Sequence, residues 1–293
     1  MATFSAKNFA AANYNLFRPT YSTSFYEHLM KYHNGPTSLV VDVGCGPGTA
    51  ARALLPFFDK VSGHDASAAM IATANSKAAE NLPPQDFERV SFHVSSSEDM
   101  GDVESGTADM VTVAQAIHWF NHKLFFQEVL RVLKPGGTLA YWYYVDPVFP
   151  KYPALNKIAD NFIYDDPRYL GSYWEQPGRN LLRGFLKDVA VPEHSFTQVK
   201  KFEFHAEQFE EGGPEKEPPL YIHQKVTLND YKAYCLTSSA YHAYKLAHPD
   251  EQIDVLDLMV EEMNKEMGWT AKDNESKILD MVFNTGYVFA KKA

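Results

Sequence analysis

The first half of the chain alternates between short apolar runs and longer segments in which apolar residues recur with helical spacing. The predicted strands cover residues 39–43, 60–64, 90–94, 110–114 and 138–144. Helical segments, bounded by glycines and prolines, are predicted at 22–32, 49–55, 67–81 and 124–133. Strands that alternate with helices need right-handed crossovers, and these produce a parallel sheet covered on both faces. The pattern therefore predicts a doubly wound α/β fold.

The pattern changes after residue 145, where prolines and aromatic residues become frequent. A stretch of this kind after a sheet strand is typical of a loop or lid over a substrate site. Beyond it, strands are predicted at 196–205 and 286–290 and helices at 230–246 and 251–267. We expect one core with an elaborated lid, because single α/β domains of this length are common.

The charge and the cysteine content of the chain argue against several classes of binding partner. The chain has 27 basic and 37 acidic residues, a formal net charge of −10. Polyphosphates and anionic membrane surfaces would be repelled on average, so we expect no nucleic acid and no membrane as partner. The sequence begins without an apolar signal segment, and its two cysteines are too few for a disulfide framework or a thiolate metal site. We therefore expect a cytoplasmic protein without a thiolate metal site. We also expect a monomer that needs no metal, although charge and cysteine content do not determine the oligomeric state.

A glycine-rich turn follows the first predicted strand, with Gly44, Gly46 and Gly48 at alternate positions. Glycines in this arrangement let the backbone pass very close to a bound small molecule. Asp65 lies where the second predicted strand ends, and a carboxylate there can accept both hydroxyls of a ribose. The two strand ends together predict a site for a nucleotide-like ligand.

The glycine spacing differs from that of dinucleotide oxidoreductases. Their turn is Gly-x-Gly-x-x-Gly, whereas Gly48 comes one residue earlier in this chain. Asp42 also places a carboxylate near the strand end, where it would disfavour a pyrophosphate and suit a ligand with a cationic amino group.

The stretch Val-Asp-x-Gly-Cys-Gly-x-Gly-Thr at 41–49 resembles the first motif of the class I S-adenosylmethionine-dependent methyltransferases. The resemblance implies a Rossmann-like, mostly parallel seven-stranded sheet that binds S-adenosylmethionine and releases S-adenosylhomocysteine. The glycine loop would cradle the methionine part, and Asp65 would hold the ribose. The other implied contacts are Tyr14 and Arg18 over the cofactor carboxylate, Asp42 toward its amino group, Met70 on the adenine, Ser97, Glu98 and Asp99 at the adenine amino group, and Ala114 and Gln115 near the methyl group.

A wider resemblance is carried by the Arg-Pro-x-Tyr stretch at 18–21, Ala-Ile-His-Trp at 116–119, Tyr-Trp-Glu-Gln-Pro-Gly-Arg at 173–179 and Ser-Ala-Tyr-His at 239–242. Together these segments resemble the fungal trans-aconitate methyltransferases and their cantharidin-resistance relatives. The resemblance implies an O-methyltransferase that forms a methyl ester on a small carboxylic acid, trans-aconitate or a related di- or tricarboxylate. In this interpretation residues 1–293 form a single domain, with a cofactor half at 1–145 and a substrate lid mainly at 146–195 and 228–272.

Methyl ester formation needs little side-chain chemistry, because a carboxylate is already ionised at neutral pH and has no proton to lose. It does need donors that orient the acid in a dry site, and the planar fork of arginine suits this task. The candidates for acceptor binding and catalysis are Arg18, His118, Trp119, Trp174 and Arg179.

Three other functions fit parts of the pattern. The acceptor could be a phenol, an isoprenoid acid or a ring carbon, and a phenol would need a base such as His118. The chain could also be a non-catalytic module that binds S-adenosylmethionine. A nicotinamide dehydrogenase is a further alternative, although its glycine spacing differs. Each candidate residue also has a plainer interpretation, with Met70 as core, Trp119 as pocket wall and the arginines as surface residues.

Overall fold

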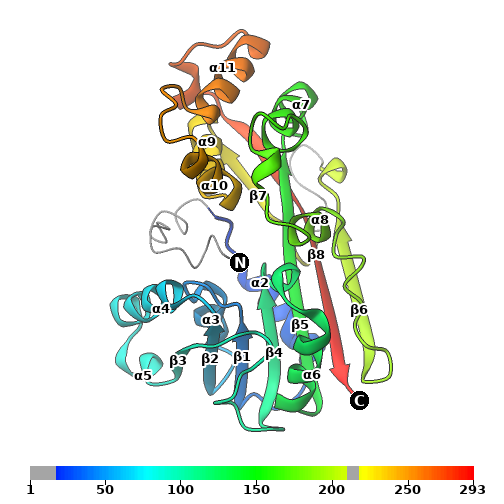
Figure 1. Ribbon diagram of the computed structural model, residues 1–293. Helices are drawn as coiled ribbons and strands as arrows, with labels where there is room; N and C mark the ends of the chain where they lie inside the picture. The colour runs from blue at the N-terminus through cyan, green and yellow to red at the C-terminus, as the bar shows by residue number, and fades with distance from the viewer. Residues whose placement is uncertain (1–17, 210–217) are drawn as a thin grey trace.

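The computed structural model describes residues 18–209 and 218–293, and they form one mixed sheet with helices on both faces (Figure 1). Its strands are β1 (Leu39–Val43), β2 (Lys60–Asp65), β3 (Val90–Val94), β4 (Ala108–Ala114), β5 (Leu133–Val148), β6 (Phe196–Phe204), β7 (His223–Val226) and β8 (Leu279–Lys292). The order is β3-β2-β1-β4-β5-β8-β6, and β7 also pairs with β8. Strands β1 to β5 pair in parallel, whereas β8 is antiparallel to β5, β6 and β7. The predicted doubly wound, mostly parallel sheet is confirmed, and the short β7 adds an eighth strand.

The main helices in the first half of the chain begin and end close to the predicted positions, whereas those in the second half differ from the prediction. They are α2 (Thr23–His33), α3 (Thr49–Leu54), α4 (Ala68–Asn81), α5 (Pro84–Phe87), α6 (His122–Val132), α7 (Pro153–Asp160), α8 (Gly178–Arg183), α9 (Leu228–Leu236), α10 (Ser239–Ala247) and α11 (Val255–Met267). The single helix predicted at 230–246 is wrong, because the chain forms α9 and α10 there. Ser238 separates them by capping α10, its hydroxyl accepting a hydrogen bond from the Tyr241 amide at 3.1 Å. No helix in the described ranges is long and apolar enough to cross a membrane.

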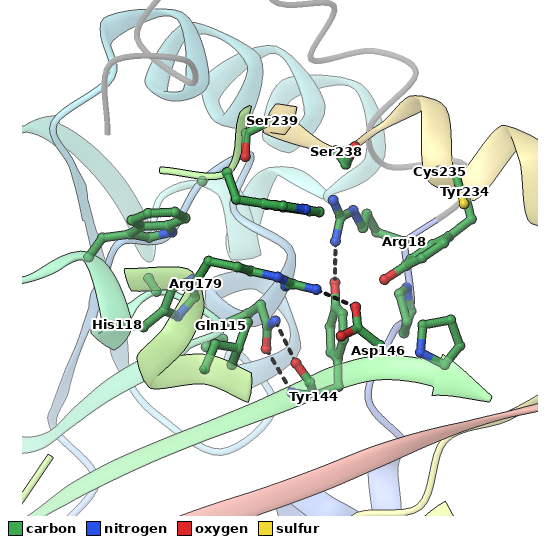
Figure 2. Close-up of a pocket in the computed structure, with 18 of the residues that line it drawn as sticks. Arg18, Gln115, His118, Tyr144, Asp146, Arg179, Tyr234, Cys235, Ser238 and Ser239 are labelled. Atoms are coloured by element: carbon green, nitrogen blue, oxygen red, sulfur yellow. Dashed lines mark hydrogen bonds and ion pairs between the residues drawn. The ribbon is translucent and has the colours of Figure 1, made fainter. Parts of the chain in front are cut away.

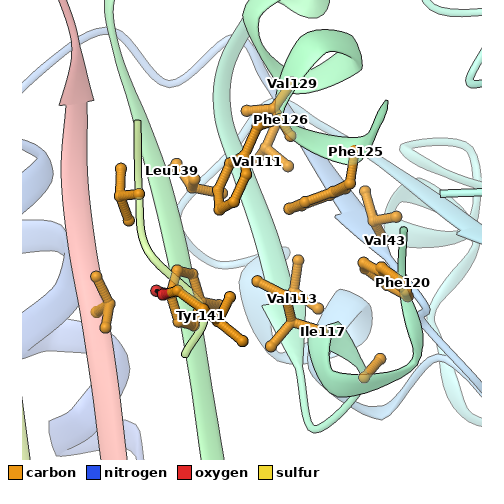
Figure 3. Close-up of a cluster of buried hydrophobic side chains, with 14 of the residues drawn as sticks. Val43, Val111, Val113, Ile117, Phe120, Phe125, Phe126, Val129, Leu139 and Tyr141 are labelled. Carbon is orange, nitrogen blue, oxygen red and sulfur yellow. Dashed lines mark hydrogen bonds between the residues drawn. The ribbon is translucent and has the colours of Figure 1, made fainter. Parts of the chain in front are cut away.

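Both faces of the central sheet are buried, which explains why β1 and β4 consist mainly of apolar residues. Tyr141 and Tyr143 of β5 pack in the cluster beneath α6 and α8, whereas Trp142 between them packs with α2 and α3. Figure 3 shows the first of these clusters, where Phe125 and Val129 of α6 lie over the side chains of β1, β4 and β5. Alternate residues of one strand thus hold both helical layers.

Strands β5 and β8 extend beyond the parallel part of the sheet. The helices of the second half of the chain lie at that end. Pro147 of β5 pairs with Phe283, and β7 pairs with the first four residues of β8. Figure 1 shows α7, α9, α10 and α11 gathered at this end of the long strands, away from α3 to α6. A separate apolar cluster, which includes Phe149, Tyr231 and Met259, packs these helices together. The long β5–β8 ladder therefore fixes the position of these helices relative to the glycine loop.

We expect Gly44→Ala to destabilise the protein more than Gly106→Ala. Both glycines have a positive φ, +66° and +67°, so both substitutions carry the conformational cost of about 1–2 kcal/mol. A Cβ on Gly44 would also lie 2.5 Å from the Ala116 Cβ, whereas one on Gly106 would meet no atom within 4 Å. Overpacking should therefore add about 1–3 kcal/mol at Gly44. Urea unfolding of the two variants measures the difference, and equal losses would contradict the close approach.

Candidate active site

A cavity opens at the carboxyl ends of β1, β2, β4 and β5, between the sheet and helices α7 to α10 (Figure 2). The loop after β1, the ends of β2, β4 and β5, and helices α8 to α10 all contribute to its wall. The carboxyl ends of parallel strands are the usual place for a ligand in open α/β sheets. The predicted residues that line it are Arg18, Gly44, Gly46, Asp65, Met70, Ala114, Gln115, His118, Trp119, Trp174 and Arg179.

The glycine loop and Asp65 form one connected unit at the sheet end of the cavity. The Gly46 amide donates a hydrogen bond to Asp65 Oδ2 at 2.9 Å, and the Ser67 amide donates to Oδ1 at 2.8 Å. Burial raises the pKa of Asp65, and these two hydrogen bonds act in the opposite direction. Each carboxylate oxygen keeps a further lone pair, so the group can still accept hydrogen bonds from two neighbouring hydroxyls.

Two predicted cofactor residues lie behind the loop and do not line the cavity. Asp42 is fully buried, and its Oδ1 accepts a hydrogen bond from Thr112 Oγ1 at 2.7 Å. Burial raises the pKa of Asp42 to about 7. Gly48 has φ +76°, and a Cβ there would lie 2.7 Å from the Phe92 ring. Both residues lie beneath the loop, and an interaction of Asp42 with the amino group of the ligand through water stays a prediction.

The loop after β3 also lies outside the cavity wall. Glu98 Oε1 accepts hydrogen bonds from Ser97 Oγ at 2.8 Å and from the Asn121 amide at 2.9 Å. Asp99 lines a separate surface hollow with His93. The structure therefore uses Glu98 to tie this loop to the start of α6, and the adenine contacts of Ser97, Glu98 and Asp99 stay predictions. Tyr14 lies outside the described residues.

Gln115 joins the two strand ends that form the floor of the cavity. Its backbone φ is +57°, and its side-chain Nε2 donates to the Tyr144 carbonyl at 2.8 Å. The Tyr144 amide in turn donates to Gln115 Oε1 at 2.7 Å (Figure 2). The amide side chain therefore closes the gap where β4 and β5 stop pairing.

His118 is buried in the cavity wall as a neutral imidazole. Only 6% of the residue is exposed, and its Nδ1 has no hydrogen-bond partner among the described residues. Burial, followed by the positive charges of Arg179, His122 and Arg18, lowers the pKa of His118 to about 3. Its ring lies 4.6 Å from that of Trp119. A group with so low a pKa is a weak general base at neutral pH.

The guanidinium of Arg179, a residue of α8, lies among aromatic rings in the cavity wall. It is 4.1 Å from the centre of the Trp174 ring and 5.1 Å from that of Tyr164. Its Nη2 donates to Asp146 Oδ1, an ion pair drawn in Figure 2. Trp174 is itself fixed, because its indole N–H donates to the Ile163 carbonyl at 2.8 Å. The guanidinium plane is therefore held before any ligand binds.

Arg18 reaches the same cavity from the other end of the chain. Its Nε donates to Thr237 Oγ1 at 2.9 Å, and its Nη1 donates to the Tyr144 hydroxyl at 3.4 Å. The Tyr234 ring lies 5.1 Å from the guanidinium. Figure 2 shows the Arg18 and Arg179 side chains projecting into one space above Tyr144. Two cations and several aromatic rings thus surround the place where an acceptor would lie.

The sequence reasoning missed several residues that line the acceptor side: Tyr144, Asp146, Tyr164, Tyr231, Tyr234, Ser238 and Ser239. Asp146 had a usable signal, since it follows the apolar part of the fifth predicted strand much as Asp65 ends the second. Tyr164, Tyr231 and Tyr234 had none, because they come from helical segments whose position over the sheet depends on long-range packing. No group of three or more metal-ligating side chains occurs in the described part of the chain.

The fold and the glycine-loop cavity define a class I S-adenosylmethionine-dependent methyltransferase, and the chain belongs to this family. Residues 41–141 match the family model described as a methyltransferase domain. The chain is 30% identical over 270 residues to the probable S-adenosylmethionine-dependent methyltransferase CRG1 of Saccharomyces cerevisiae, with 88% of each chain covered. It is also 30% identical over 206 residues to the methyltransferase pgmE of Aspergillus terreus, which covers 64% of this chain and 60% of that protein.

A solved structure from Anaeromyxobacter dehalogenans, named as a type II methyltransferase, shares the fold. Its TM-score is 0.67 at 23% identity, and the match covers 94% of this chain and 98% of that one. This likeness confirms the predicted fold, and the likeness to CRG1 confirms the predicted class I methyltransferase family.

The residues at the sheet end of the cavity fit S-adenosylmethionine. Gly46 has φ +53° and open space where a Cβ would stand, so its backbone can contact a ligand directly. Asp65 is already oriented by two amides and can accept the ribose hydroxyls. Met70 is 5% exposed and lines the wall on the first turn of α4. Gly44, Gly46, Asp65 and Met70 are thus the residues that would hold the cofactor.

Proposed function

We propose that this protein is a carboxyl O-methyltransferase that forms the methyl ester of a small organic acid, trans-aconitate or a related di- or tricarboxylate. The observation that carries the proposal is the pair Arg18 and Arg179, which line the same cavity as the glycine loop and Asp65. Guanidinium groups bind carboxylates with paired, charge-assisted hydrogen bonds. An acid bound there would lie between the lid and the cofactor loop.

The chain needs to position and desolvate the acid, with no need to activate it. Bound S-adenosylmethionine supplies a methyl group that is electrophilic without further help. Trp119, Trp174 and Tyr234 give the cavity apolar walls, which exclude water from a carboxylate held by the arginines. Since the acid is ionised at neutral pH, no side chain has to remove a proton. The contribution of the protein is orientation and a dry site.

An acceptor screen tests the proposal directly. Purified protein is incubated with S-adenosylmethionine carrying an isotopically labelled methyl group and with a panel of small mono-, di- and tricarboxylic acids. We expect mass spectrometry to find the mass of one added methyl group on at least one acid, and base treatment to release it as methanol, as an ester requires. Methylation of phenols alone, or cofactor binding without turnover on any acceptor, would refute the proposal.

The ionisation of His118 should not control the rate in the pH range where histidine ordinarily titrates. The folded-state pKa of His118 is lowered to about 3, below its ordinary 6.5, so the ring is neutral throughout that range. The acid is ionised above about pH 5. We therefore expect kcat/KM for the acid to show no step due to His118 between about pH 6 and about pH 8, and a step near pH 7 that both proteins share would belong to Asp42, whose pKa burial raises to about 7. A pH profile of wild type and His118→Asn measures this, and a rise near pH 6.5 that the variant loses would favour a phenol acceptor with His118 as base.

A further inference from the structure

The acceptor side of the cavity contains a fixed carboxylate that acid binding does not by itself require. Asp146 follows the part of β5 that pairs with β4 and lines the cavity beside Arg179. Its Oδ1 accepts hydrogen bonds from Arg179 and, at 2.5 Å, from the Tyr164 hydroxyl. Arg183 lies 3.5 Å away, with its Nε toward Asp146 Oδ2.

The arginines and the carboxylates that form ion pairs around Asp146 are equal in number. Arg179 pairs with Asp146, and Arg183 lies between Asp146 and Asp160, whose Oδ1 is 3.7 Å from Arg183 Nη2. Two guanidinium groups thus face two carboxylates. The N–H donors of Arg179 therefore have a carboxylate beside them, and Arg18 is a further cation in the cavity wall. A second or third carboxylate on a substrate would gain hydrogen bonds there but would also meet the negative charge of Asp146.

We propose that Asp146 is a specificity-determining residue that limits how many carboxylates an acceptor acid carries. It holds the Arg179 guanidinium against Trp174, which favours binding of one carboxylate, and it repels further negative charge at the same end. This inference rests on the proposed function and narrows its substrate class toward acids with fewer charges. The amide in Asp146→Asn keeps an oxygen that can accept from Arg179 and removes the charge, so it separates positioning from repulsion.

The test is a comparison of affinities for acids of increasing charge. Butanoate, succinate and propane-1,2,3-tricarboxylate are titrated calorimetrically into wild-type protein and Asp146→Asn, each loaded with S-adenosylhomocysteine. We expect the affinity for the tricarboxylate, relative to that for butanoate, to rise about tenfold in Asp146→Asn, because buried charges are weakly screened. Asp146→Glu restores the charge and should return the ratio toward that of wild type.

Asp280→Asn is the matched control. Asp280 is similarly half-buried and paired, with His223 at 2.9 Å and Lys151 at 3.3 Å, but it does not line the cavity. This variant should leave the affinity ratio unchanged.

Equal weakening of all three acids in Asp146→Asn would mean that Asp146 only supports Arg179, and an unchanged ratio would mean that its charge has no effect. Either result overturns the inference while leaving the proposed function intact. If both proteins bind S-adenosylhomocysteine but none of the acids, the acid site itself is refuted, and the inference with it.

Discussion

Replacing Arg179 with alanine should lower kcat/KM for the acid at least about a hundredfold while leaving the affinity for S-adenosylhomocysteine nearly unchanged. The variant loses charge-assisted hydrogen bonds to the carboxylate, each stronger than a neutral one, and it leaves Asp146 in the cavity without its ion-pair partner. Both effects oppose an anionic substrate. The cofactor loop is built from separate residues, so its affinity should not follow. Steady-state kinetics and calorimetry measure the two quantities.

Arg168→Ala is the control for Arg179→Ala. Arg168 is 77% exposed, is paired with Asp166, and does not line the cavity, so its removal tests for a general effect of lost positive charge. Arg179→Lys should fall between wild type and alanine, because a lysine keeps the charge and loses the planar fork. Full activity in Arg179→Ala would contradict its role in acid binding.

Replacing Asp65 with alanine should weaken cofactor binding about a hundredfold or more. The carboxylate is the group placed to accept the ribose hydroxyls, and it also orders the Gly46 and Ser67 amides at 2.9 and 2.8 Å. Two lost hydrogen bonds to a charged acceptor, each contributing about 1.5–3 kcal/mol, account for a change of this size. Calorimetric titration with S-adenosylhomocysteine measures it, and methylation should fall in parallel at low cofactor concentration.

Asp59→Ala provides a matched change just before the opposite end of β2, where the residue is exposed and outside the cavity. Its cofactor affinity should equal that of wild type. Asp65→Asn should be intermediate, because one oxygen acceptor remains. An Asp65→Ala variant that stays folded and binds S-adenosylhomocysteine normally would show that the loop alone holds the cofactor.

The elements of the cofactor half could be predicted because their signals are local. Strand β3 begins and ends where the alternation at 90–94 placed it, and β1 ends directly before the first glycine of the loop. The far end of β5 had no such signal, since Asp146 and Pro147 interrupt the apolar run. That end is a strand because Pro147 and Val148 pair with Phe283 and Val282, far along the chain.

The residues proposed to bind the acceptor show the same difference between local signals in the sequence and long-range contacts in the structure. Arg18 and Arg179 were selected by resemblance, yet nothing local in the sequence indicates that both reach one cavity. Arg18 meets Tyr144 across 126 positions and Thr237 across 219. Asp146 lies beside Arg179 only because α8 packs against the end of the sheet. Contacts of this range depend on the folded positions of whole elements.

The sequence by itself determined the α/β class, the glycine loop and its partnership with Asp65, because parallel strands bring their carboxyl ends to one edge whatever covers them. The tertiary structure decided that Asp42 and Glu98 support the site from outside the cavity and that Asp146 faces Arg179 within it. The physical reason is the β5–β8 ladder. Its pairing of distant segments sets where helices α7 to α10 lie, and their side chains complete the wall of the cavity.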